Sequence, residues 1–142
     1  MNQLSTLIEF LQRGRVGPIS LGLSESEARA AIPIQPQVGL VRPHKILKYE
    51  ETQLTFSPHL VQIRISLIEH TQPLLVAQLL AGPSVYQFRS YLSTHKIEST
   101  WESPSPWEKQ GMLGSGVKAL AVDDTVVAVA FARPLNEWLG AR

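Results

Sequence analysis

A phrase that occurs twice along the chain constrains its fold more than any other feature. Residues 22–32 and 82–92 both read Gly-x-Ser-x-x-Glu/Gln-x-Arg-x-x-Ile/Leu, with Ser24 and Ser84 at the same place in each copy. A serine followed three residues later by Glu or Gln is a capping box, which marks the start of a helix. The sequence therefore predicts two capped helices, one from each serine, that end near Ile32 and His95.

Each predicted helix is followed by segments with the period-two pattern of β-strands. The clearest segment lies at 60–67, where Val61, Ile63, Ile65 and Leu67 alternate with polar residues. Such alternation indicates a strand with one buried face and one solvated face. The same reasoning predicts further strands at 46–49, 53–56, 97–102, 117–122 and 126–132, with turns at Ser57-Pro58-His59 and at Asp123-Asp124.

Proline and glycine predict the loops, and apolar spacing predicts two more helices. Segments 34–43 and 103–114 are rich in Pro and Gly and are expected to be loops. Leu4, Leu7, Ile8 and Leu11 follow helical spacing, with Gly14 as the expected stop. A short terminal helix is expected at 135–139, with Trp138 packed down.

These elements predict a single α+β domain over 1–142, with an antiparallel sheet of about five to seven strands and helices on one face. Two tandem αβ repeats, 16–67 and 76–132, are expected. Duplication of one unit and a pattern common to any two helix–hairpin units are both left open. The expected core comprises Leu54, Phe56, Ile63, Ile65, Leu120, Val122, Val127, Val129 and Phe131.

Composition and charge exclude several classes of partner. The 142 residues are 44% apolar and 18% charged, with a formal net charge of +1. So small a charge argues against nucleic-acid and anionic-membrane binding. The chain has no cysteine, so disulfides and thiolate chemistry are excluded. No apolar run is long enough to span a bilayer and no leader pattern is present, so a cytoplasmic location is expected.

Motifs of catalysis and of cofactor binding are missing from the sequence. The four histidines have no helical pair spacing for a metal, and no nucleophile elbow or phosphate-binding loop occurs. Gly114-Ser115-Gly116 is interpreted as a flexible entry to a strand. Neither Glu50-Glu51 nor Asp123-Asp124 is expected to work as a catalytic pair. The sequence therefore predicts no enzyme, no catalytic residue, no cofactor and no metal.

Two tryptophans in the segment 101–108 are the most unusual side chains. Trp101 and Trp107 flank two prolines, and Glu102 and Glu108 lie beside them. Tryptophan is enriched at binding hot spots because it buries a large rigid surface. A lid over the core and contact with a partner are both open for these rings. The four residues are the candidate partner-binding site.

A family resemblance points the same way. Gly22-Leu23-Ser24, then Leu47-Lys48-Tyr49 and Leu54-Thr55-Phe56, resemble the helix-plus-meander unit of the beta-lactamase inhibitor protein fold. The unit also resembles that of the outer-membrane SmpA/OmlA lipoproteins and of small bacterial immunity factors. The resemblance covers roughly 20–67, with a weaker echo over 82–132. It implies a non-enzymatic protein-binding module, such as an immunity-type inhibitor of a toxin or enzyme. Glu102 and Glu108 favour a basic toxin as its partner. The alternative is a small-ligand-binding or small-molecule-processing domain.

Overall fold

Two long runs of strands each follow a capped helix. The computed structural model describes residues 4–41, 43–68 and 73–132. Its helices are α1 (Leu7–Arg13), α2 (Glu25–Ala31) and α3 (Val85–Thr94). Its strands are β1 (Ser5–Thr6), β2 (Gln37–Val41), β3 (His44–Tyr49), β4 (Thr52–Phe56), β5 (Leu60–Ser66), β6 (Leu75–Val76), β7 (Ser99–Ser105), β8 (Glu108–Leu113), β9 (Lys118–Val122) and β10 (Thr125–Ala132).

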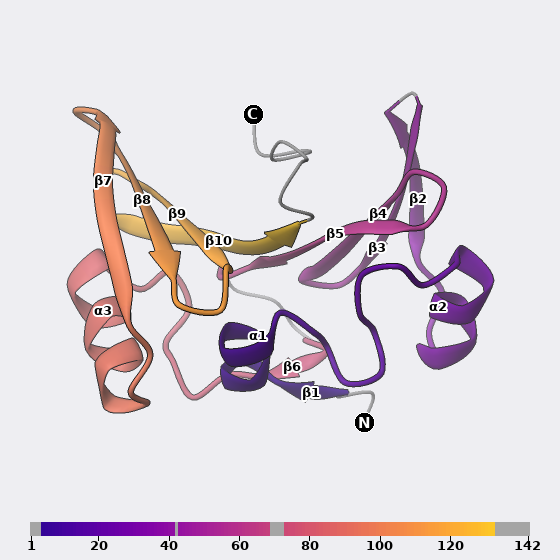
Figure 1. The fold of residues 1–142 in the computed structure, drawn as a ribbon, viewed down its shortest axis with the longest axis horizontal. Coiled ribbons are helices and arrows are strands. Elements are labelled where there is room, and N and C mark those ends of the chain that lie inside the picture. The colour runs from indigo at the N-terminus through magenta and orange to yellow at the C-terminus, as the bar shows by residue number, and fades with distance from the viewer. Residues whose placement is uncertain (1–3, 42, 69–72, 133–142) are drawn as a thin grey trace.

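Eight of these strands form one antiparallel sheet. Their order is β2-β3-β4-β5-β10-β9-β8-β7, so the two halves of the chain meet where β5 pairs with β10. A separate small sheet pairs β1 with β6 in parallel. The predicted α+β class and antiparallel sheet are confirmed (Figure 1). The prediction of about five to seven strands in the sheet is wrong, because the main sheet has eight strands within the described residues.

The expected strand number is too low because two segments expected as loops contain strands. The segment 34–43 contains β2, and the segment 103–114 contains the end of β7 and all of β8. Pro36 and Pro43 flank β2 without interrupting it. Pro104 lies within β7, an edge strand, where a missing N–H need not remove a ladder hydrogen bond.

The helix ends follow the predicted caps. Ser24 and Ser84 each accept a hydrogen bond from the backbone N–H three residues on, and the Glu27 and Gln87 side chains complete both capping boxes. Gly14 ends α1 in the left-handed conformation, at φ 70°. Leu4 lies before the helix rather than in it, because Thr6 caps the start of α1. The predicted terminal helix at 135–139 lies outside the described residues.

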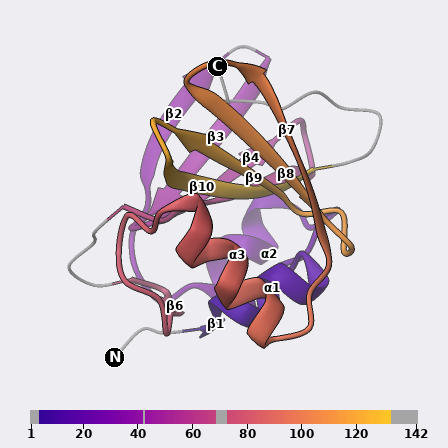
Figure 2. The same ribbon diagram turned by 90° about the vertical axis from the view of Figure 1, so that its left-hand side faces the viewer.

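All three helices lie on one face of the large sheet (Figures 1 and 2). Strand register assigns Lys45, Trp101 and Phe131 to the same face, because directly paired residues point to the same side. Lys45 forms an ion pair with Glu25 of α2, and the Trp101 ring contacts Phe88 of α3. The Phe131 ring lies against the glycine that ends α1. The predicted placement of helices on one face is confirmed.

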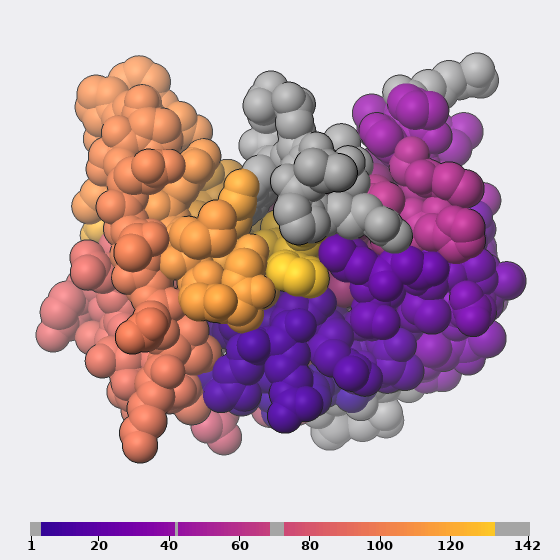
Figure 3. Space-filling view, viewed as in Figure 1, coloured from indigo at the N-terminus to yellow at the C-terminus, as the bar shows by residue number. Residues whose placement is uncertain are grey.

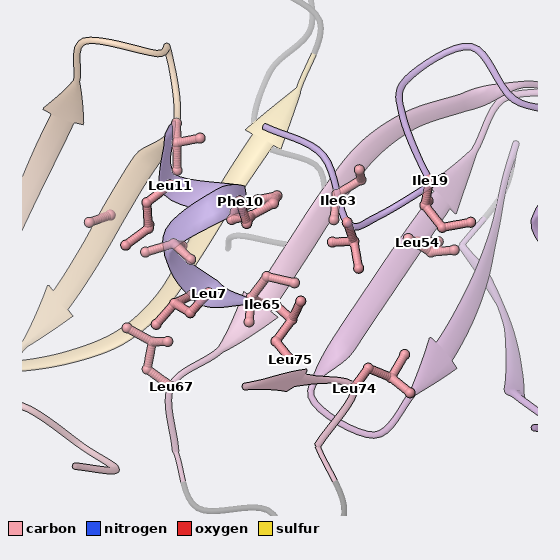
Figure 4. Packing of buried hydrophobic residues seen from close by; sticks show 14 of the residues in the cluster. Leu7, Phe10, Leu11, Ile19, Leu54, Ile63, Ile65, Leu67, Leu74 and Leu75 are labelled. Carbon is pink, nitrogen blue, oxygen red and sulfur yellow. The ribbon is translucent and has the colours of Figure 1, made fainter. Parts of the chain in front are cut away.

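Helix α1 occupies the middle of the helix-covered side. Leu7, Phe10 and Leu11 are fully buried. Figure 4 shows Phe10 on the side of α1 that faces Ile63 and Ile65 of β5, and Leu11 on the opposite side of the helix. Burial of large apolar side chains at this position stabilises the junction between the two halves of the sheet.

Five predicted core positions are buried, but the core of β9 and β10 differs in part. The buried ones are Leu54, Phe56, Ile63, Ile65 and Val129. Phe131 is partly buried, as are three further predicted positions: Leu120, Val122 and Val127. Smaller or neighbouring residues are buried instead: Ala119, Ala121 and Val126. A β-bulge between Val126 and Ala128 exchanges the faces on its two sides. In β9, the larger residues of the alternating pattern do not point to the helices.

The two halves share one order of elements. A capped helix precedes four antiparallel strands in each, over α2 and β2–β5 and again over α3 and β7–β10. This order agrees with the predicted repeats at 16–67 and 76–132. A shared order arises either by duplication or from independent use of the same simple pattern, so duplication stays a prediction.

Candidate functional site

The sheet has a second face that carries none of the three helices. Figure 1 shows the sheet curving so that this face is concave, with β2–β3 and β7–β8 at its two ends. Register places one row of side chains across its middle: Lys48, Gln53, Arg64, Ala130 and Lys118. A second row contains Ile46, Thr55, Gln62 and Ala132. We call this surface the helix-free face.

The middle of the helix-free face is polar and desolvated. Thr55 is 2% exposed and Gln62 is 0% exposed. The amide nitrogen and oxygen of Gln62 find no hydrogen-bond partner among the residues that the structure describes. Burial also lowers the pKa of Arg64 from its usual value. A buried amide without partners costs about 1–3 kcal/mol, so Gln62 is a destabilising residue at this position.

The β7–β8 end of the helix-free face carries two carboxylates. Glu102 pairs in register with Gln110, and Glu108 lies two residues before Gln110 on β8. Alternation along the strand therefore puts both glutamates on the helix-free face. Glu102 is exposed, and Glu108 accepts a hydrogen bond from Ser105 at 3.2 Å. The structure thus brings two of the four predicted site residues together on one surface.

Trp101 lies on the opposite face. Its ring meets Phe88 edge-on at 6.2 Å between centroids and lies where a side chain of Gly111 would be. Its indole N–H donates to Ser99 Oγ at 3.0 Å. The ring is half-buried and covers part of the core. This position corresponds to the core lid, one of the two alternatives open from the sequence.

Trp107 lies at the tip of the β7–β8 hairpin. It belongs to the two-residue turn between the strands, and 60% of it is exposed. Its carbonyl accepts a hydrogen bond from the Asp123 N–H at 2.9 Å, which fixes the turn against the β9–β10 hairpin. A large exposed ring on a backbone held in this way loses little entropy when it binds. In Figure 3 the hairpin is the orange upper part of one end of the molecule.

A cavity beside α1 is the main alternative site. It has a volume of about 310 Å³ and is lined mainly by apolar residues, among them Leu7, Ile65 and Leu79. Its two polar side chains already have backbone partners. The Glu51 carboxylate accepts hydrogen bonds from the N–H groups of Leu74 and Leu75. Ser66 Oγ accepts one from the N–H of Ile68. The lining therefore offers a ligand few free polar groups.

The remaining sequence candidates have structural positions. Arg29 pairs with Glu25 at 2.8 Å. The hydrogen bond from Lys45, followed by that from Arg29, holds the pKa of Glu25 below its ordinary value, against the opposing effect of desolvation. Ser115 Oγ donates to the Leu11 carbonyl at 2.7 Å.

The acidic pairs and histidines also occupy structural positions. Glu50-Glu51 is the β3–β4 turn, and Asp123-Asp124 is the predicted β9–β10 turn. His95 caps the end of α3 as expected, and His70 lies outside the described residues. No group of three metal-ligating side chains occurs within the described part of the chain.

Two features of the candidate sites are not predicted from the sequence. One is the burial of Gln62, because the alternating pattern of 60–67 places this residue on the face expected to be solvated. The other is the carboxylate of Glu51, whose partners lie 23 and 24 residues away. The local sequence around a glutamate in a turn does not predict a hydrogen-bond partner so far along the chain.

Comparisons of the chain with known proteins give no family. No protein-family description, curated protein or solved structure matches this sequence or this fold. Among the described residues, the helices are too short or too polar to cross a membrane. The case for a function therefore rests on the geometry of the helix-free face, of the β7–β8 hairpin and of the cavity.

Proposed function

We propose that this protein is a protein-binding module that acts as an immunity-type inhibitor of a toxin or enzyme. The helix-free face is its contact surface. The observation that carries the proposal is the segregation of the sheet, with all three helices on one side and a curved, polar surface on the other. A broad surface with dispersed polar groups suits a protein partner better than a small molecule, which prefers an enclosed apolar pocket.

The β7–β8 hairpin supplies the anchor of this surface. Trp107 is the largest exposed side chain there, while Glu102 and Glu108 lie on the helix-free face beside it. At this end of the surface, two carboxylates near an exposed ring favour a basic group of the partner, and they increase its association rate at low salt. The proposed contact surface includes Trp107 and excludes Trp101, because the Trp101 ring packs against α3.

A small-ligand domain is the alternative function. It would use the 310 Å³ cavity beside α1. This alternative has less support because Glu51 and Ser66, the polar side chains of the lining, are engaged by backbone N–H groups.

Removal of the exposed indole tests the proposal. A partner captured from the source cells with the wild-type chain is purified, and its affinity for Trp107→Ala is measured by calorimetry. We expect affinity to fall at least tenfold with an unchanged melting temperature, because a hot-spot truncation costs about 2 kcal/mol or more. Tyr86→Ala is the matched control, since Tyr86 is 79% exposed at the start of α3, on the helix-covered side.

A second variant tests the electrostatic part. Glu102→Lys should slow association at low salt and have a smaller effect at high salt. The proposal fails if the partner binds Trp107→Ala and Glu102→Lys as it binds wild type. It also fails if Tyr86→Ala is the variant that loses affinity, because the contact surface would then lie on the helices.

A further inference from the structure

Strand β2 is an open edge of the eight-stranded sheet. It pairs with β3 on one side, and it is the last strand in the order. All five of its residues are exposed, including Val38 at 55%, Leu40 at 67% and Val41 at 60%. Among the described residues no strand pairs with its outer side. Such an edge presents a row of backbone donors and acceptors to another strand.

The two edges of the sheet differ in chemistry. The other edge strand, β7, contains Glu102 and Pro104, and charges and proline are the usual protection against pairing with another chain. Strand β2 reads Gln-Val-Gly-Leu-Val and contains neither a charge nor a proline. Its aliphatic residues lie on both faces of the strand. The protection is therefore present at one edge of the sheet and missing at the other.

We propose that β2 is a docking edge for a second copy of this chain, through antiparallel pairing of β2 with β2 about a two-fold axis at Gly39. The centre of the strand is self-complementary. With Gly39 opposite itself, Val38 faces Leu40 of the second copy, so aliphatic side chains meet on one side of the joint sheet. Gln37 then faces Val41, and no charge faces a like charge.

A second copy of this chain fits this edge better than a charged strand of another protein. An uncharged strand offers no ion pair to a charged partner strand, whereas the aliphatic residues of two copies would bury each other. The chain already joins its own halves by an antiparallel pair, β5 with β10, so one more such joint continues the same sheet. The exposed patch is small beside a standard interface of about 1,200–2,000 Å². We therefore expect a concentration-dependent dimer.

Sedimentation of the full chain tests the proposal first. Wild type should change from a 15.8 kDa monomer toward a dimer as its concentration rises from about 1 µM to about 1 mM, the range of a modest interface. Leu40→Lys should abolish the dimer and leave the melting temperature unchanged, because Leu40 is exposed. Leu80→Lys is the matched control, since this leucine is 79% exposed elsewhere on the molecule.

Single cysteines test the position of the two-fold axis. The chain has no cysteine of its own, and a Cβ at Gly39 would meet only the Ile46 Cβ, at 4.0 Å. Gly39→Cys should form a disulfide-linked dimer rapidly, because paired Cα atoms lie about 4.5–5.5 Å apart. In Val41→Cys the two Cα atoms lie about 14 Å apart at 3.4 Å per residue, beyond disulfide reach.

Each outcome of these experiments decides the proposal. A concentration-dependent dimer that is lost in Leu40→Lys, together with selective cross-linking of Gly39→Cys, supports it. A wild-type chain that stays monomeric over the whole range overturns it, including the case in which a strand of another protein is found on β2. A dimer that survives Leu40→Lys, or equal cross-linking of Val41→Cys and Gly39→Cys, overturns it too.

Discussion

Replacing Glu51 with alanine tests whether one buried carboxylate holds the connection between the two halves of the chain. Glu51 is 5% exposed, at the turn between β3 and β4. Its Oε1 accepts the N–H of Leu74 at 2.8 Å, and its Oε2 accepts the N–H of Leu75 at 3.0 Å. Both leucines are buried. The carboxylate therefore attaches the segment that precedes α3 to the first half of the sheet.

The expected cost of Glu51→Ala follows from the two donors that lose their acceptor. Each unsatisfied buried N–H costs about 1–3 kcal/mol, so the variant should lose about 2–6 kcal/mol of unfolding free energy. At about 4 °C per kcal/mol for a chain of this size, the melting temperature should fall by about 8–24 °C. Glu51→Gln keeps one acceptor oxygen and puts an amide N–H₂ against the other donor, so its loss should be intermediate.

Urea unfolding followed by circular dichroism measures these differences as a change in midpoint with an unchanged slope. Glu50→Gln is the matched control, because the neighbouring glutamate makes no hydrogen bond of this kind to a distant segment among the residues that the structure describes. Its stability should stay within about 0.5 kcal/mol of wild type. A Glu51→Ala variant as stable as Glu50→Gln would refute the reasoning, because the two buried N–H groups would then have other partners.

Three further predictions test packing, register and charge. Gly111→Ala should destabilise the chain strongly, because its Cβ would lie 2.6 Å from atoms of the indole ring packed there, whereas Gly114→Ala should be tolerated, with its nearest contact at 4.0 Å; thermal melts compare the two. Leu54→Ala should cost about 2–5 kcal/mol in urea unfolding and Leu120→Ala much less, because only the first leucine lies in the core. The carboxyl pKa of Glu25 is lowered in the folded chain, so its contribution to stability should be present above the unfolded-state pKa and lost as pH falls through the folded-state pKa, which an NMR titration of this carboxyl measures.

Local sequence chemistry predicts the elements that depend on neighbours along the chain. The capping boxes at Ser24 and Ser84 need only a serine and a Glu or Gln three residues later, and both form. The Asp123-Asp124 turn joins two alternating strands, and both residues adopt the positive φ that a tight hairpin needs. Interactions within a few residues fix these elements, so no knowledge of the sheet is required.

Tertiary context decides the elements that the sequence does not predict. Strand β2 looks like a loop between prolines, and it forms because β3 offers it an edge with which to pair. The same holds for β8, which lies between β7 and β9. The bulge at Val126 shifts one register, and nothing local distinguishes the two faces of an alternating segment. Pairing partners and faces depend on distant residues.

The candidate site was predictable in part for the same reason. The segment 101–108 contains Trp107 and both glutamates of the proposed contact surface. Its two tryptophans, unusual in a proline-rich segment, indicate it as a candidate from the sequence alone. Its conformation was not predictable, because its prolines suggest a loop. Within a strand, alternation separates neighbours, so Trp101 and Glu102 point to opposite faces of β7. The two residues therefore belong to different surfaces.

This opposition gives a way to separate folding from binding within one strand. The Trp101 ring packs on α3 and on Gly111, so its removal should lower stability wherever the function lies. Glu102 is exposed on the helix-free face, where a substitution usually changes stability by less than about 0.5 kcal/mol. If the helix-free face binds the partner, Glu102 variants lose binding and keep stability, whereas Trp101 variants lose stability first. If the helices bind it, Glu102 variants lose neither, because their side chain lies on the far side of the sheet.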